Sequence, residues 1–130
     1  MTEREAASQA CVLVVDDDAQ VRQVIQWALE DEGFLVLGAA NGREAMALVA
    51  GGAPDLVVLD LTLPEMNGLE VAERVRALER RPVPILLITA DGQAPAKAER
   101  VGAYTFLRKP FQIEDLLNAV RTGLRSLADG

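Results

Sequence analysis

The chain has 130 residues, of which 50% are hydrophobic and 25% charged, with a formal net charge of −7. This length and apolar content suit one domain around one core, and no stretch approaches the roughly 18 uninterrupted apolar residues of a membrane span. The acidic balance argues against direct nucleic-acid binding and the N-terminus lacks a signal-peptide pattern, so a cytoplasmic protein that contacts neither nucleic acid nor membrane is predicted.

The counts of two residue types narrow the chemistry. Histidine is absent, which removes an imidazole general base, an imidazole metal ligand and a phosphohistidine donor. Cys11 is the only cysteine, so an internal disulfide and a cysteine-based metal site are excluded. Its position in an apolar run predicts a buried structural thiol. Phosphorus or proton chemistry in this chain must therefore run on carboxylates.

The first predicted unit is a strand followed by a helix. Residues 1–10 show no hydrophobic period and predict a flexible N-terminal segment, whereas residues 11–128 predict the folded domain. The apolar run over residues 11–15 predicts a strand. Asp18 can cap a helix that Gly33 ends, because apolar residues recur there at helical spacing: Val21, Val24, Ile25, Ala28 and Leu29.

Two further units follow. Residues 34–39 predict a strand, and Asn41 with Glu44 resembles a capping pair for a short helix that the turn at residues 51–54 ends. Residues 55–59 predict the third strand. After a loop the hydrophobic period is again that of a helix, with apolar positions Leu69, Ala72, Val75 and Leu78.

The last two units complete an alternating pattern. Residues 83–89 predict a strand and residues 91–102 a short helix, in which Pro95 is tolerated only in the first turn. Residues 104–108 predict the fifth strand. The closing helix has one apolar face: Ile113, Leu116, Leu117, Val120, Leu124 and Leu127. Together these units predict an α/β fold of the flavodoxin-like type, a doubly wound five-stranded parallel sheet of order 2-1-3-4-5 with five helices.

Reactive side chains stand where four of the predicted strands end. Asp16 and Asp17 follow the first strand, Asp60 follows the third, Thr89 ends the fourth, and Lys109 follows the fifth. The C-terminal ends of parallel strands share one edge of the sheet, and the order 2-1-3-4-5 has its switch point between strands one and three. The sequence therefore predicts three carboxylates, a hydroxyl and an ammonium group in one cleft.

Three carboxylates in one cleft require a neutralising cation. Two unit charges about 4 Å apart repel by on the order of 4 kcal/mol at an effective dielectric constant of roughly 20. Mg2+ suits such a site, with Mn2+ as an alternative, because it takes carboxylates, a carbonyl and water and leaves room for a phosphoryl oxygen. Lys109 and Thr89 suit the phosphoryl oxygens, which leaves Asp60 free to attack.

Four motifs at these strand ends resemble those of one family. Val-Asp-Asp-Asp closes the first strand, Asp-x-x-x-Pro-x-x-x-Gly follows the third, Thr-Ala closes the fourth and Lys-Pro-Phe follows the fifth. In this order and spacing they resemble the receiver domain of bacterial two-component response regulators, which has a chemotaxis-regulator-like fold. The resemblance extends from Cys11 to the last helix.

The resemblance implies a phosphoacceptor signalling domain rather than an enzyme with a separate substrate. Asp60 would take a phosphoryl group from a phosphohistidine of a sensor histidine kinase or histidine phosphotransfer protein. Only phosphorylation and dephosphorylation of the domain itself would be catalysed. Asp17, Asp60 and the backbone carbonyl of Thr62 would hold Mg2+, with Asp16 helping directly or through water.

The resemblance also implies a conformational switch. Thr89 and Lys109 would contact the phosphoryl oxygens, and the peptide bond between Lys109 and Pro110 would be cis. Movement of Thr89 toward the phosphoryl group would leave space for the Phe106 ring to turn from an exposed to a buried rotamer. The fourth helix, fifth strand and fifth helix would then present a changed surface to a downstream effector or to a second copy of the chain.

The first helix leaves two interpretations open. Trp27 lies beside its apolar stripe, which predicts a half-buried packing residue. Alternatively, part of a surface that docks on the partner's helices is formed by Gln20, Val21, Val24 and Trp27.

Two other functions fit part of the pattern. An aspartyl-phosphate phosphatase of the haloacid-dehalogenase type would use Asp60 as its nucleophile, although that class typically has an aspartate where this chain has Thr62. An unphosphorylated interaction module would keep only the fold. Steady turnover of a phosphate ester would favour the first, and complete loss of Mg2+ binding would favour the second.

Overall fold

A computed structural model describes residues 10–51, 54–61, 68–77, 83–90, 92 and 94–129. The flexible segment predicted for residues 1–10 lies, apart from Ala10, outside the described residues. The strands are β1 (Cys11–Val15), β2 (Leu35–Ala39), β3 (Leu56–Asp60), β4 (Ile85–Thr89) and β5 (Thr105–Arg108).

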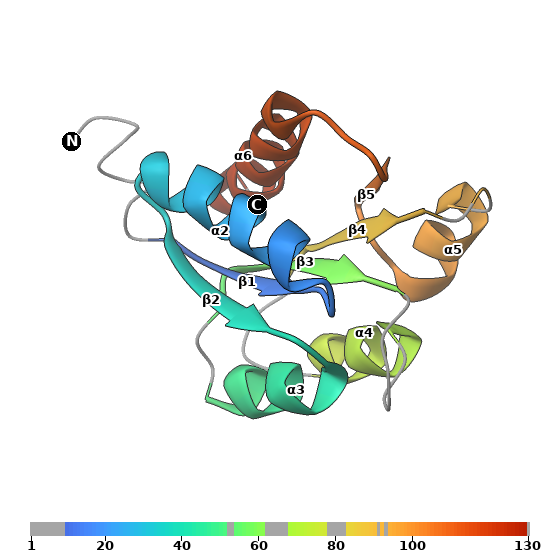
Figure 1. The fold of residues 1–130 in the computed structure, drawn as a ribbon. Coiled ribbons are helices and arrows are strands. Elements are labelled where there is room, and N and C mark those ends of the chain that lie inside the picture. The colour runs from blue at the N-terminus through green and yellow to red at the C-terminus, as the bar shows by residue number, and fades with distance from the viewer. Residues whose placement is uncertain are drawn as a thin grey trace.

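These strands form one parallel sheet in the order β2-β1-β3-β4-β5 (Figure 1). In the register, Val15 of β1 pairs with Ala39 of β2 on one side and with Leu59 of β3 on the other. Every residue of β3 and β4 is buried, because both faces of these central strands are covered by helices. The predicted fold class is confirmed.

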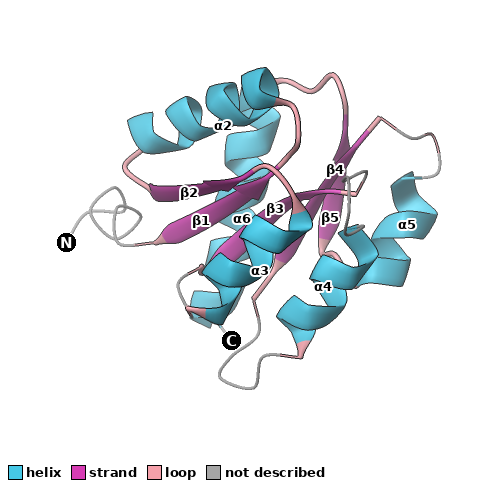
Figure 2. Cartoon of the chain, turned by 60° about the horizontal axis from the view of Figure 1, so that its bottom comes forward, coloured by secondary structure: helices cyan, strands magenta, loops and turns pink. Residues whose placement is uncertain are grey.

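Helices cover both faces of the sheet, with α2 and α6 on one face and α3, α4 and α5 on the other (Figures 1 and 2). None of the described helices is long and apolar enough to cross a membrane. The helices are α2 (Ala19–Asp31), α3 (Gly42–Ala50), α4 (Gly68–Arg76), α5 (Ala94–Val101) and α6 (Ile113–Asp129).

The side chains of β1 divide between two hydrophobic clusters. Val12 and Val14 belong to the cluster under α2 and α6, whereas Leu13 and Val15 belong to the one under α3 and α4. This alternation follows from the pleat of a strand, in which successive side chains point to opposite faces. The sheet therefore lies between two hydrophobic cores. The C-terminal ends of the strands are where ligands bind in open sheets of this kind.

The predicted caps account for the starts of two helices. The Asp18 carboxylate accepts two backbone N–H groups of the first turn of α2, and Gly33, with φ of 96°, follows the end of that helix. Asn41 accepts the N–H of Glu44 at 2.9 Å at the start of α3. Pro95 lies in the first turn of α5. Backbone N–H groups in the first turn have no acceptor within the helix, so the missing N–H of proline costs no hydrogen bond there.

The strand boundaries differ slightly from the prediction. β3 includes Asp60, so this carboxylate is carried by a buried strand rather than by the following loop. β4 begins at Ile85, after Pro84, because proline has no N–H to donate to a neighbouring strand. β2 and β5 each begin one residue later than predicted. Leu78 lies outside the described residues, and the side chains of Leu69 and Leu127 are likewise not described.

The prediction of a buried thiol at Cys11 is wrong, because this side chain is only partly buried. Cys11 opens β1 at the end of the sheet opposite to the reactive residues, and its N–H donates to Asp55 at 2.7 Å. Partial burial and the nearby charge of Asp55 raise the pKa of the thiol. The group therefore stays protonated at neutral pH and is a poor nucleophile.

Candidate functional site

Three carboxylates lie together where two neighbouring strands end. Asp16 and Asp17 follow β1, and Asp60 is the last residue of β3. One oxygen of each carboxylate lies within 4.8 Å of the others. Asp16 is fully buried and Asp60 is 4% exposed, whereas Asp17 is exposed. The structure thus brings together the predicted acidic cluster, with Asp17 on its solvent side.

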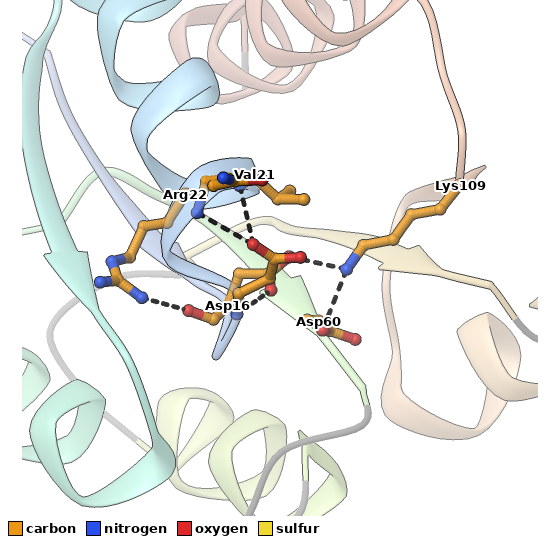
Figure 3. A network of polar contacts seen from close by, with 7 residues as sticks. Asp16, Val21, Arg22, Asp60 and Lys109 are labelled. Atoms are coloured by element: carbon orange, nitrogen blue, oxygen red, sulfur yellow. Dashed lines mark hydrogen bonds and ion pairs between the residues drawn. The ribbon is translucent and has the colours of Figure 1, made fainter.

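Lys109 bridges the two buried carboxylates (Figure 3). Its Nζ atom lies 2.8 Å from Oδ2 of Asp16 and 3.2 Å from Oδ2 of Asp60. The other oxygen of Asp16 accepts the backbone N–H of Asp18 at 2.9 Å. Buried carboxylates are costly without donors and a compensating charge, and Lys109 supplies both.

The electrostatic balance keeps Lys109 charged. Partial burial by itself lowers the pKa of this ammonium group. Hydrogen bonding to Asp16 and the charges of Asp60 and Asp16 outweigh that effect, so the pKa of Lys109 is raised above its usual value. The side chain therefore remains a cation at physiological pH.

The donor set of the cluster fits a hard divalent cation. One ammonium group cannot neutralise three carboxylates, and all three offer oxygen ligands that Mg2+ prefers. Asp17 is exposed, so an ion can reach the cluster from solvent. Thr62, whose backbone carbonyl is the remaining predicted ligand, lies outside the described residues.

The hydroxyl residue of the site ends the next strand of the sheet. Thr89 is 1% exposed and lies one residue beyond Ile88, which pairs with Asp60. Its carbonyl oxygen accepts the N–H of Lys109 at 2.9 Å, which ties the end of β4 to the backbone of the lysine. The peptide bond between Lys109 and Pro110 is cis.

Phe106 lies inside β5, where it pairs with Leu87 of β4. Its side chain is half-buried. Among the described strands, β5 lies at the edge of the sheet and pairs with β4 alone. One side of Phe106 is therefore not constrained by a neighbouring strand.

The docking residues predicted on α2 include two exposed apolar side chains. Trp27 is 64% exposed and Val24 is 48% exposed. The prediction that Trp27 is a half-buried packing residue is wrong, because the buried face of α2 is centred on Ile25 and Leu29. Gln20 is exposed and Val21 is half-buried. The docking surface stays a prediction.

Among the residues that the structure describes, Arg22 contacts the site and was not predicted from the sequence. Arg22, in the first turn of α2, donates from Nη1 to the backbone carbonyl oxygen of Asp16 at 2.7 Å. The available signal was its place four residues after the helix cap Asp18, close in sequence to the acidic pair. An arginine at that position is equally typical of a solvent-exposed helix residue, so the sequence alone does not predict its contact with Asp16.

The fold and site together define an open α/β domain with an acidic cluster, bridged by a lysine, at the switch point of its sheet. Residues 12–121 match the family model described as the response regulator receiver domain. The chain belongs to this family, whose members act in two-component signalling.

Named relatives agree with that assignment. Response regulator MprA of Mycolicibacterium vanbaalenii is 40% identical over 116 residues, which are 88% of this chain and 50% of MprA. Sporulation initiation phosphotransferase F of Bacillus subtilis is 32% identical over 112 residues, which are 85% of this chain and 90% of that protein. The chain spans about half the length of the first curated relatives that it matches.

A solved structure shows the same fold. The crystal structure of response regulator protein TrrA from Thermotoga maritima, in complex with Mg2+-BeF, superposes with a TM-score of 0.78 at 32% identity. The match covers 87% of this chain and 97% of that one.

Proposed function

We propose that residues 11–128 form a phosphoacceptor domain in which Asp60 receives the phosphoryl group. The observation that carries this proposal is the bridge from Lys109 to Asp16 and Asp60 in the cleft at the switch point. Asp60 is held by a strand that is buried along its whole length. A rigid strand positions a reacting group better than a loop does.

In the proposed reaction, a carboxylate oxygen of Asp60 attacks the phosphorus of a phosphohistidine on a sensor histidine kinase or histidine phosphotransfer protein. A P–O bond forms while the P–N bond breaks, and the imidazole nitrogen keeps the electron pair of that bond. These 130 residues include no histidine, so the phosphohistidine donor lies outside them. Attack of water on the acyl phosphate returns the carboxylate and phosphate, so the chain acts only on its own phosphoryl group.

Asp16, Asp17 and Asp60 would hold Mg2+ or Mn2+, with the carbonyl of Thr62 as a further ligand. Bound there, the ion would neutralise the carboxylates and the phosphoryl oxygens that approach them. The proximity of the three carboxylates supports this site. So does TrrA, whose structure is a complex with Mg2+-BeF.

Two side chains would bind the transferred group. Lys109 would exchange its bond with Asp60 for one with a phosphoryl oxygen, since its raised pKa keeps the ammonium group charged. Thr89, at the end of the adjacent strand, would donate its hydroxyl to another phosphoryl oxygen. Both residues then discriminate the phosphorylated from the unphosphorylated cleft.

The proposed switch passes from Thr89 to Phe106. A Thr89 side chain drawn toward the phosphoryl group leaves space that the half-buried Phe106 ring can enter. The surface of α5, β5 and α6 would change with it and engage a downstream effector or a second copy of the chain. Docking on the kinase or phosphotransfer protein would use the side of α2 that carries Gln20, Val21, Val24 and Trp27.

Incubation with acetyl phosphate and Mg2+, followed by intact mass measurement, tests the proposal. One phosphoryl group per chain is expected, and the Asp60→Asn variant should acquire none. Asp55→Asn, at the other end of the same run of residues, is the matched control and should be phosphorylated like the wild type. Undiminished incorporation in Asp60→Asn would overturn the proposal.

The two other functions predict different results in the same assay. Steady release of phosphate from an ester would favour the phosphatase of haloacid-dehalogenase type. No incorporation, together with no Mg2+ binding, would favour an interaction module that keeps only the fold.

A further inference from the structure

The side chain of Arg22 contacts the backbone of the acidic cluster and not its carboxylates. Its Nη1 atom donates to the carbonyl oxygen of Asp16 at 2.7 Å. Figure 3 shows Arg22 and Lys109 approaching Asp16 from opposite sides, Lys109 at the carboxylate and Arg22 at the main chain. The two cations therefore hold different parts of one residue.

The carbonyl group of Asp16 needs a donor from outside the sheet. The N–H of Asp16 still donates to the carbonyl oxygen of Ala39 at 3.1 Å. The pairing of β1 with both neighbouring strands, however, ends at Val15. Beyond Ala39 the chain turns into α3, so no strand N–H continues the ladder there. Asp16 is fully buried, and a buried carbonyl without a partner costs free energy. The guanidinium group of Arg22 satisfies it with a charge-assisted hydrogen bond.

This contact completes the restraint of Asp16. Its N–H, its carbonyl and both carboxylate oxygens are each hydrogen-bonded, the last two to the Asp18 N–H and to Lys109. The restrained carbonyl belongs to the same planar peptide unit as the nitrogen of Asp17. The direction in which the exposed Asp17 side chain leaves the backbone depends on that plane.

We propose that Arg22 is a positioning residue of the phosphoacceptor site. By fixing the peptide unit between Asp16 and Asp17, it holds the Asp17 carboxylate where a divalent cation needs it. This inference rests on the proposed function, since it assumes that Asp17 is a metal ligand. Groups that orient metal ligands commonly change metal affinity by about 10–100-fold when they are removed.

The test compares Mg2+ affinity, measured by titration calorimetry, in the wild type, Arg22→Met, Arg22→Lys and Arg121→Met. Arg121 pairs with Glu32 at 2.8 Å between α6 and the end of α2, so its variant loses an arginine contact outside the site. We expect affinity to fall at least about tenfold in Arg22→Met and about threefold in Arg22→Lys, which keeps a donor on a shorter chain. Arg121→Met should stay within about twofold of the wild type.

A kinetic measurement separates positioning from general damage. In Arg22→Met, the Mg2+ concentration that half-saturates phosphorylation by acetyl phosphate should rise about tenfold, while the rate at saturating Mg2+ stays within about threefold of the wild type. Unfolding temperatures identify any variant that does not fold. If Arg22→Met is unfolded, Arg22→Lys carries the test.

Three outcomes overturn the inference. One is an Arg22→Met variant, or in its absence an Arg22→Lys variant, that binds Mg2+ as the wild type does. The second is an equal loss of affinity in Arg121→Met. The third is a wild-type chain that does not bind Mg2+, which also overturns the proposed function, whereas the first two leave phosphorylation of Asp60 intact.

Discussion

At the scale of single residues, one lysine side chain reaches two carboxylates of the acidic cluster. Lys109 lies within 3.2 Å of both Asp16 and Asp60, which are almost entirely buried. Loss of the lysine would remove the ion pair from two buried carboxylates, and breaking such a pair is usually strongly destabilising. The same residue is thus a stabilising contact in the resting cleft and the proposed ligand of the phosphoryl group.

Alkaline pH is expected to weaken the fold through Lys109. Its pKa is raised in the folded state, so the stability from its contacts is fully present below the pKa of the unfolded chain. That stability is lost as the pH rises through the higher folded value. Urea unfolding between about pH 9 and pH 12 should show a falling free energy of unfolding, and the fall should be smaller in Lys109→Met.

The control for this pH dependence is Lys97→Met, which removes a lysine of α5 and should retain the full fall. Tyr104, whose pKa is raised by burial, contributes a fall of the same sign in all three proteins. Identical pH dependence in the wild type and Lys109→Met would contradict the role assigned to the bridge.

Asp18 tests the difference between a helix cap and a metal ligand. Its carboxylate accepts two N–H groups of α2, whereas its contact with Asp16 uses only its own backbone N–H. Asp18→Ala is expected to lower the free energy of unfolding by about 1 kcal/mol. Calorimetry should find Mg2+ affinity within about twofold of the wild type. A tenfold loss of Mg2+ affinity would instead make Asp18 part of the metal site. Asp18→Asn is the control for the cap and should keep most of the free energy of unfolding.

At the scale of elements, α6 and the start of β5 fit together through a glycine. A Cβ atom on Gly123 would lie 2.6 Å from the hydroxyl oxygen of Tyr104 and 2.8 Å from a methyl carbon of Leu56. The Tyr104 hydroxyl donates to the carbonyl of Ala119 at 2.6 Å. The tyrosine ring therefore crosses the helix where α6 has no side chain, and this contact joins α6 to the strand that carries Phe106.

Gly123→Ala should destabilise the protein although alanine is the better helix former. Helix propensity favours alanine by about 1 kcal/mol, but overpacking costs about 1–3 kcal/mol and the nearby atoms leave no room. We expect a net loss of about 1 kcal/mol in urea unfolding. The loss should shrink when Tyr104→Ala is combined with it. Gly92→Ala is the control, because a Cβ there meets nothing within 4 Å. A stabilised Gly123→Ala variant would show that the ring moves aside freely.

At the scale of the whole molecule, phosphorylation should act on one side of the sheet. Thr89 and Phe106 lie on β4 and β5, so amide hydrogen exchange is expected to change along α5, β5 and α6 and to change little in α3. The Asp60→Asn variant, treated in the same way, supplies the control. Uniform changes in hydrogen exchange over both halves of the sheet would contradict a local switch. Sedimentation of the phosphorylated chain is a separate measurement and would reveal self-association.

Much of this molecule follows from local sequence patterns. The apolar runs predict the five strands, and the helix starts follow from Asp18 and Asn41, because caps and hydrophobic periods act within a few residues of the chain. The acidic cluster is predictable too, since the ends of parallel strands always share one edge of the sheet. The family's motifs add the roles expected of Asp60 and Thr89.

Other features depend on which parts of the chain meet. Trp27 is exposed because the buried face of α2 points elsewhere, and Cys11 is partly exposed because of its place at the end of the sheet. The requirement for glycine at position 123 arises because the ring of Tyr104 packs across α6. Sequence periodicity indicates a buried face but not the atoms that cover it. The contact of Arg22 with Asp16 likewise depends on where the β-ladder runs out of donors, which only the packed sheet decides.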